Sequence, residues 1–195
     1  NFSAIAESLG EAGIAAADFI LADLGFCSAQ LADAETGLSF RDEDMPLDMR
    51  FDASLETTAA DIVNGYDEKA LADLIYKYGE DRASRRIARF IVRRRQHERI
   101  TTTGQLVEIV CGALKRPGAK RKATKHPAAR TFQALRIAVN HELENLKALL
   151  SAGPGLLKKD VFLAVISFHS LEDRLVKWDF KQRQQDGVYR VLTKK

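Results

Sequence analysis

Hydrophobic and polar positions along the chain predict two short strands separated by a long helical stretch. Continuous apolar runs at 18–22 and 161–168 are typical of buried strands. From about residue 55 to 126, apolar residues recur at helical spacing. A further apolar stripe predicts one long helix over 129–150. Two strands linked through long helices indicate an α/β sheet.

Residues that favour helix ends predict where several elements begin and stop. A helix over 3–13 is expected before the first strand, a Gly-Pro-Gly turn at 153–155 before the second, and a last short strand at 189–193. Ser170 and Asp173 fit a capping box at the start of a helix that follows the second strand. The other predicted N-caps are Thr58, Asp67 and Thr103.

The same pattern predicts two domains. Residues 1–52 and 127–195 contain the strands and are assigned to one α/β core, in which 26–52 form a long loop. Residues 53–126 are helical throughout and are predicted to be a second, basic domain inserted between the two strands.

Charge is distributed unevenly, although the net charge of the whole chain is only +3. Residues 1–79 carry 16 acidic and 4 basic side chains, whereas residues 80–136 carry 4 acidic and 16 basic ones. A positive block of this kind attracts phosphate groups and favours nucleic-acid binding. The alternative is a solvated helix face whose charge balances the acidic half.

Several classes of protein are excluded or disfavoured. Because no apolar run approaches ~18 residues, a membrane span is excluded. The two cysteines cannot form a disulfide framework, and the absence of CxxC or HxxxH spacing argues against a structural zinc site. An intracellular location is expected. Neither a GxGxxG nor a GxxxxGK[ST] phosphate loop occurs.

Candidate chemistry lies where the predicted strands end, since ligands of open α/β sheets bind at the carboxyl ends of strands. Asp23 ends the first strand and can accept hydrogen bonds from a ligand amine or hydroxyl, or it can equally serve as a turn residue. His169 follows the second strand beside Ser170, Glu172 and Asp173. No nucleophile-elbow pattern surrounds Ser170, so hydrolase chemistry is not favoured.

Seven stretches of the sequence resemble those of a known protein family, which the spacing of apolar residues alone does not identify. In this sequence they are 23–31, 37–41, 46–50, 78–80, 86–89, 126–143 and 163–177. In order and in content they resemble the MraW (RsmH) family. Its members are S-adenosyl-L-methionine-dependent methyltransferases that act on N4 of a cytidine in bacterial 16S ribosomal RNA.

The resemblance implies a class I, Rossmann-like methyltransferase core, incomplete at its N-terminus, with an inserted all-helical domain. S-adenosyl-L-methionine would be the cofactor, small-subunit ribosomal RNA or the 30S subunit the partner, and the cytoplasm the location. No metal and no membrane are implied. The family's glycine-rich loop would precede Asn1, so we expect this chain to be inactive alone.

Site residues follow from the same resemblance. Phe2 would stack near the adenine of the cofactor, Asp23 would lie at the methyl-transfer end as the catalytic residue, and Gln30 would close a loop over it. Basic residues are expected to contact RNA phosphates near the cleft and over the inserted domain. They are Arg85, Arg86, Arg89, Lys125, Arg130 and Arg136.

Two alternatives stay open. A non-catalytic RNA-binding module would account for the basic block without a glycine-rich loop. A DNA amino-methyltransferase is less favoured, because no (N/D/S)PP(Y/F/W) motif occurs in the sequence.

Overall fold

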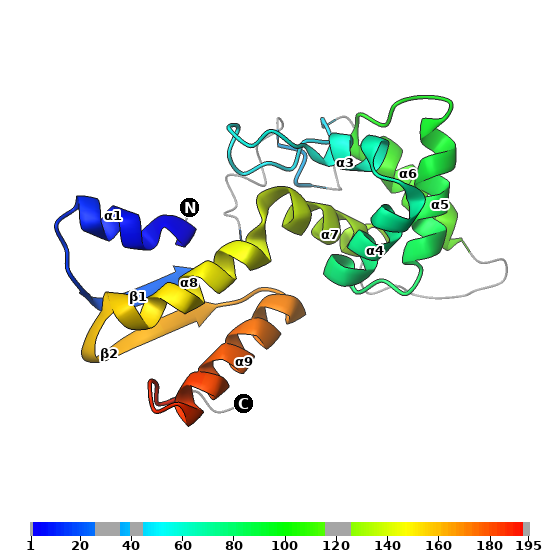
Figure 1. Cartoon of the computed structure of the whole chain (residues 1–195). Coiled ribbons are helices and arrows are strands. Elements are labelled where there is room, and N and C mark those ends of the chain that lie inside the picture. Colours follow the sequence, from blue (N-terminus) through cyan, green and yellow to red (C-terminus); the bar gives the residue numbers. More distant parts are fainter. Residues whose placement is uncertain (1, 26–35, 40–44, 116–125, 193–195) are drawn as a thin grey trace. The chain divides into compact units, whose positions relative to one another are not determined.

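The computed structural model describes residues 2–25, 36–39, 45–115 and 126–192, drawn in colour in Figure 1. The chain forms two compact units, which we call the strand unit (residues 1–25 and 141–195) and the helical unit (residues 26–140). None of the described helices is long and apolar enough to cross a membrane.

In the strand unit, a two-stranded parallel sheet packs with helices. Its elements are η1 (Phe2–Ala4), α1 (Ile5–Glu11), β1 (Ala17–Asp23), α8 (Glu142–Leu156), β2 (Leu157–Ile166) and α9 (Ser170–Gln185). The strands pair from Phe19 opposite Phe162 to Asp23 opposite Ile166. Because parallel strands require a long crossover, this pairing confirms the predicted α/β character.

Only one face of this sheet is buried by the described residues. Ala22 and Leu24 of the β1 segment join a cluster with Leu146, Leu149 and Leu150 of α8 and Val176 of α9. On the other face the large side chains are about half exposed: Phe19 53%, Leu21 56%, Phe162 57% and Ile166 45%. The two apolar runs therefore form strands as predicted, but their side chains alternate between a buried and an exposed face.

Five helices make up the described part of the helical unit. They are α3 (Ala59–Gly65), α4 (Glu68–Gly79), α5 (Ser84–Arg95), α6 (Thr103–Leu114) and α7 (Ala129–Asn140). Thr58 and Asp67 cap α3 and α4 as predicted. The cap of α6 is Thr102 instead of Thr103, because Thr102 Oγ1 accepts the Gln105 N–H and Gln105 Oε1 accepts the Thr102 N–H.

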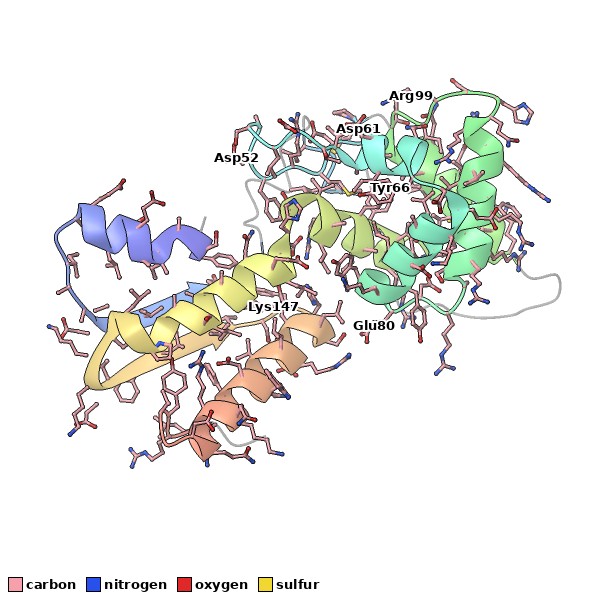
Figure 2. The ribbon with its side chains drawn as sticks, viewed as in Figure 1. Asp52, Asp61, Tyr66, Glu80, Arg99 and Lys147 are labelled. Carbon is pink, nitrogen blue, oxygen red and sulfur yellow. The ribbon has the colours of Figure 1, made fainter. Side chains whose placement is uncertain are left out.

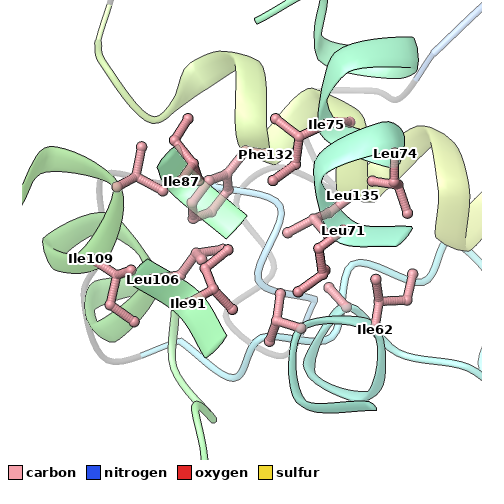
Figure 3. Close-up of a cluster of buried hydrophobic side chains, with 14 of the residues drawn as sticks. Ile62, Leu71, Leu74, Ile75, Ile87, Ile91, Leu106, Ile109, Phe132 and Leu135 are labelled. Carbon is pink, nitrogen blue, oxygen red and sulfur yellow. The ribbon is translucent and has the colours of Figure 1, made fainter. Parts of the chain in front are cut away.

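The apolar stripes of these helices meet in one core, shown in Figure 3. Its members are almost inaccessible to solvent, as their helical spacing predicts. They include Ile62, Leu71, Ile75, Ile87, Ile91, Leu106, Phe132 and Leu135. Residues 45–52 and 128–140 also pack in the helical unit, so it is larger than the 53–126 segment assigned from sequence.

Three sequence predictions about element boundaries are wrong. The helix expected over 129–150 is two helices, because His141 adopts a left-handed conformation with φ of 51°. The expected turn at 153–155 is the last part of α8, which contains Pro154 and ends at Leu156. Residues 189–192 form no strand, and 193 lies outside the described residues.

Gly79 permits the close approach of α4 and α7. A Cβ added there would lie 2.5 Å from the backbone oxygen of Arg130. We therefore expect Gly79→Ala to lower the free energy of unfolding by about 2 kcal/mol, because the helices must separate. Gly112→Ala in α6 is the matched control. No atom lies within 4 Å of its added Cβ, and the better helix propensity of alanine should raise stability by up to ~1 kcal/mol.

Urea denaturation followed by far-UV circular dichroism measures both variants. Equal midpoints for Gly79→Ala and Gly112→Ala would show that the contact between α4 and α7 tolerates the extra methyl group.

Candidate active site

The carboxyl ends of β1 and β2 lie side by side. Asp23 is paired with Ile166, and the Leu24 N–H donates to the Ile166 carbonyl at 3.1 Å. The Asp23 side chain is exposed and forms no hydrogen bond or ion pair with any residue that the structure describes. An exposed carboxylate at the ligand-binding edge of a parallel sheet can accept hydrogen bonds from a bound amine.

The segment after β2 is held by a capping box. His169 is the N-cap of α9: its Nδ1 accepts the Glu172 N–H at 3.4 Å. Glu172 Oε2 accepts the N–H groups of Phe168 at 2.9 Å and of His169 at 3.3 Å. The prediction that Ser170 and Asp173 form this box is wrong by one residue, because Ser170 is already helical.

Glu142, His169 and Glu172 form a buried polar cluster at the same place. Glu142 is 8% and Glu172 3% exposed, and candidate metal-ligand atoms of the three residues lie within 4.8 Å of one another. His169 Nδ1 accepts the Glu172 N–H, and His169 Nε2 lies 3.3 Å from Glu172 Oε1. The hydrogen bonds of Glu172 to the backbone show that this cluster positions the start of α9.

The cofactor residues implied by the resemblance are only partly described. Phe2 is half-buried and packs against the cluster that contains Ala22 and Leu24, the neighbours of Asp23 along the chain. Phe2 and Asp23 therefore belong to the same unit. Gln30 lies outside the described residues.

Arg85, Arg86 and Arg89 lie together on the exposed face of α5, opposite its buried residues. Arg86 donates to the Lys115 carbonyl at 3.2 Å and Arg89 pairs with Glu68 at 3.5 Å. Arg85 forms no ion pair or hydrogen bond with the described part of the chain. The α5 face thus keeps exposed positive charge.

The remaining predicted RNA contacts are more scattered. Arg130 on α7 is exposed and donates to the Glu80 carbonyl at 3.1 Å. Arg136, also on α7, is half-buried. Lys125 lies outside the described residues. Arg95 and Arg99 are engaged in structural contacts: Arg95 donates to the Val63 carbonyl at 2.7 Å, and Arg99 pairs with Asp61 at 2.9 Å (Figure 2).

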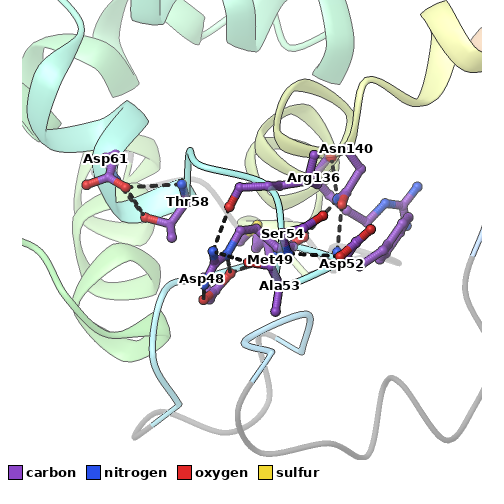
Figure 4. Close-up of polar contacts among 12 residues, drawn as sticks. Asp48, Met49, Asp52, Ala53, Ser54, Thr58, Asp61, Arg136 and Asn140 are labelled. Atoms are coloured by element: carbon purple, nitrogen blue, oxygen red, sulfur yellow. Dashed lines mark hydrogen bonds and ion pairs between the residues drawn. The ribbon is translucent and has the colours of Figure 1, made fainter.

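Residues 46–50, one of the stretches that carry the resemblance, form a structural junction in the helical unit (Figure 4). Arg50 binds both carboxylate oxygens of Asp48 at 2.8 Å. Burial opposes ionisation of Asp48, but its hydrogen bonds with Arg50 outweigh that effect and hold the pKa of Asp48 below its ordinary value. The side chains of Leu47 and Met49 are each 1% exposed.

Asn140 fixes this junction to α7. Its side-chain amide donates to the Met49 carbonyl at 2.7 Å and its oxygen accepts the Phe51 N–H at 2.7 Å. Met49 has a φ of 67°, which is unfavourable for a residue with a side chain. Sequence analysis missed Asn140, although an amide beside the apolar stripe of a helix is the signal for a buried hydrogen-bonded group.

The model of the MraW methylase family matches residues 1–192. Three relatives, each called ribosomal RNA small subunit methyltransferase H, show the extent of the similarity. The protein from Acidobacterium capsulatum is 50% identical over 97% of this chain and 61% of its own length.

The relative from Geotalea uraniireducens is 51% identical over 95% of this chain and 58% of its own length. For the one from Picosynechococcus sp. the identity is 54%, over 91% of this chain and 58% of the relative. The chain thus spans about three fifths of the length of these curated relatives. It belongs to the MraW methylase family, a family of methyltransferases, and the resemblance inferred from its motifs is confirmed.

Proposed function

We propose that the protein containing this chain transfers a methyl group from S-adenosyl-L-methionine to N4 of a cytidine in 16S ribosomal RNA. The observation that carries the proposal is about 50% identity, over nearly the whole chain, to proteins called ribosomal RNA small subunit methyltransferase H. Such a substrate would place the activity in the cytoplasm, with the small ribosomal subunit as partner.

Within that protein, the strand unit would be part of a class I, Rossmann-like core and the helical unit would contain the inserted domain. Two adjacent parallel strands support the first assignment, since class I cores are built on parallel sheets. The continuous helical core of α3 to α7 supports the second. The 53–126 boundaries of the insert stay a prediction.

Residues of the strand unit fit part of a site for S-adenosyl-L-methionine. Phe2 offers an aromatic ring for the adenine, and Asp23 offers an exposed carboxylate for a cationic group. Gln30 would contribute from outside the described residues. When bound, the cofactor supplies an electrophilic methyl group on a sulfonium centre.

Asp23 has the chemistry needed to prepare the acceptor base. The lone pair of the cytosine N4 amine is delocalised into the ring, which makes the amine a weak nucleophile. A carboxylate that accepts its hydrogens would orient the amine and increase electron density on nitrogen. Because a base stacked in RNA cannot present its N4 amine to a protein carboxylate and a methyl donor together, the cytosine would have to leave its stacked position.

Arginines of α5 would hold the RNA by its phosphates. We expect the triple variant Arg85→Glu, Arg86→Glu, Arg89→Glu to weaken binding to a 16S ribosomal RNA fragment at least about 10-fold and to flatten its salt dependence. Lys69→Glu on α4 is the control, because Lys69 is exposed but pairs with Asp73 at 3.0 Å. Filter binding at several salt concentrations measures the effect.

In that experiment, wild-type affinity that does not change between low and high salt would contradict phosphate binding by α5.

Methylation itself is tested with the full-length gene product, 30S subunits and tritiated S-adenosyl-L-methionine. The expected result is labelled 16S ribosomal RNA that yields N4-methylated cytidine on nucleoside mass spectrometry. Salt-dependent RNA binding without methyl transfer would instead favour the non-catalytic RNA-binding module.

A further inference from the structure

Phe168 is an exposed aromatic ring on a rigid support. At 69%, it is the most exposed of the large hydrophobic side chains in the described structure. Its backbone is nevertheless fixed, because the Phe168 N–H donates to Glu172 Oε2 at 2.9 Å and Glu172 is only 3% exposed. Phe168 is therefore an exposed aromatic side chain on an ordered backbone.

The ring lies at the carboxyl edge of the sheet, beside the end of β1. A Cβ added to Gly25 would be 3.6 Å from Phe168 Cδ2, so the ring lies close to the turn that follows Asp23. Gly25 has a φ of 90°, a conformation that only glycine adopts readily. This turn brings the carboxylate of one strand end and the aromatic ring of the other to the same edge.

A flat aromatic ring and a carboxylate at the same edge of a sheet are suited to an unpaired nucleobase. Aromatic side chains stack on the faces of unstacked bases, and a carboxylate accepts hydrogen bonds from the amino group of cytosine. Phe2 is the aromatic residue assigned to the adenine of the cofactor, whereas the Phe168 ring is 69% exposed and can stack on a base.

We propose that Phe168 stacks on the cytosine that is methylated, while Asp23 accepts hydrogen bonds from its amine. This proposal rests on the proposed function. It assigns base recognition to Phe168, two residues beyond the end of β2, and it makes this residue a determinant of how firmly the base is held outside its RNA stack.

Three substitutions separate stacking from apolar packing. In the full-length gene product, Phe168→Ala and Phe168→Leu should each lower kcat/KM for 30S subunits about 10- to 100-fold, because the loss of one base–aromatic stack has that size. Phe168→Tyr should stay within about threefold of wild type. Affinity for S-adenosyl-L-methionine, measured by calorimetry, should not change in any of the three.

Trp178→Ala is the matched control. Trp178 is 66% exposed on α9 of the same unit, away from the strand ends, and its loss should leave kcat/KM unchanged. Circular dichroism shows whether each variant is folded. A second readout uses a short single-stranded RNA with one pyrrolocytidine, whose fluorescence is quenched when the base stacks: wild type and Phe168→Tyr should quench it, and Phe168→Ala should not.

The outcomes are distinguishable. Wild-type kcat/KM in Phe168→Ala, or equal activity of the leucine and tyrosine variants, overturns the stacking proposal. Loss of cofactor affinity, or unfolding of Phe168→Leu, would assign the ring to the cofactor or to packing against another segment. If wild type fails to methylate 30S subunits, the proposed function fails, and the fluorescence experiment still decides whether Phe168 stacks on a base.

Discussion

Replacing Asp23 with asparagine is expected to lower methyl transfer by the full-length gene product about 100-fold or more, with RNA binding close to wild type. Asparagine has nearly the same size, but it replaces one acceptor oxygen with an NH₂ donor that would face the hydrogens of the acceptor amine. Because the Asp23 side chain is exposed and makes no hydrogen bond with the described residues, the substitution should not destabilise the fold.

Asp18→Asn provides the control on the same strand. Asp18 lies near the opposite end of β1, and Lys158 Nζ binds its carboxylate at 2.8 Å on the protein surface. Exposed ion pairs of this kind contribute little to stability, so Asp18→Asn should retain full activity. Single-turnover methylation of 30S subunits and calorimetry with S-adenosyl-L-methionine measure both variants. Normal turnover and normal cofactor affinity in Asp23→Asn would reduce Asp23 to a turn residue.

The second large effect is expected at Asn140. Asn140→Leu keeps the side-chain volume but leaves the Met49 carbonyl and the Phe51 N–H without their partner. Each buried backbone group that loses its hydrogen bond costs ~1–3 kcal/mol, so we expect a loss of about 3 kcal/mol in the free energy of unfolding. Met49 would also lose the contact that supports its positive φ.

Native-state hydrogen exchange of amides in α4 and α7 reports on the helical unit directly. Gln96→Leu is the control, since Gln96 is an exposed amide residue at the end of α5 and should change stability by less than ~0.5 kcal/mol. Exchange rates in Asn140→Leu that match those of Gln96→Leu would show that water replaces the Asn140 amide without cost.

Periodicity predicted the elements whose apolar faces are continuous. The helices α4 to α6 and the two apolar strands are found where the pattern places them. Burial of one face of an element determines both its apolar pattern and its position in the fold. Periodicity failed at His141, since the stripe continues through 129–150 while a single left-handed residue breaks the backbone. A break in backbone hydrogen bonding leaves no trace in the apolar pattern.

Candidate site residues could be predicted only where their position next to a predicted strand or helix was itself a signal. Asp23 was found because it ends an apolar run, and the structure puts it at the expected edge of the sheet. The cap at His169 was assigned to Ser170, because Ser is the commoner cap and the reach of Glu172 to two backbone N–H groups depends on three-dimensional geometry. The closeness of Phe168 to Gly25 brings together residues far apart in sequence, and no pattern in the sequence indicates it.

The parallel pairing of β1 with β2 also has a consequence for how the chain folds. Asp18 and Lys158, in contact across the sheet, are 140 residues apart in sequence, so the sheet cannot form until a very long loop has closed. The helical unit shortens that loop once folded, since Phe51 and Asn140 are joined by a hydrogen bond. We therefore expect the helices to fold first from local contacts, and the strands, with Asp23 and Phe168 at their ends, to come together last.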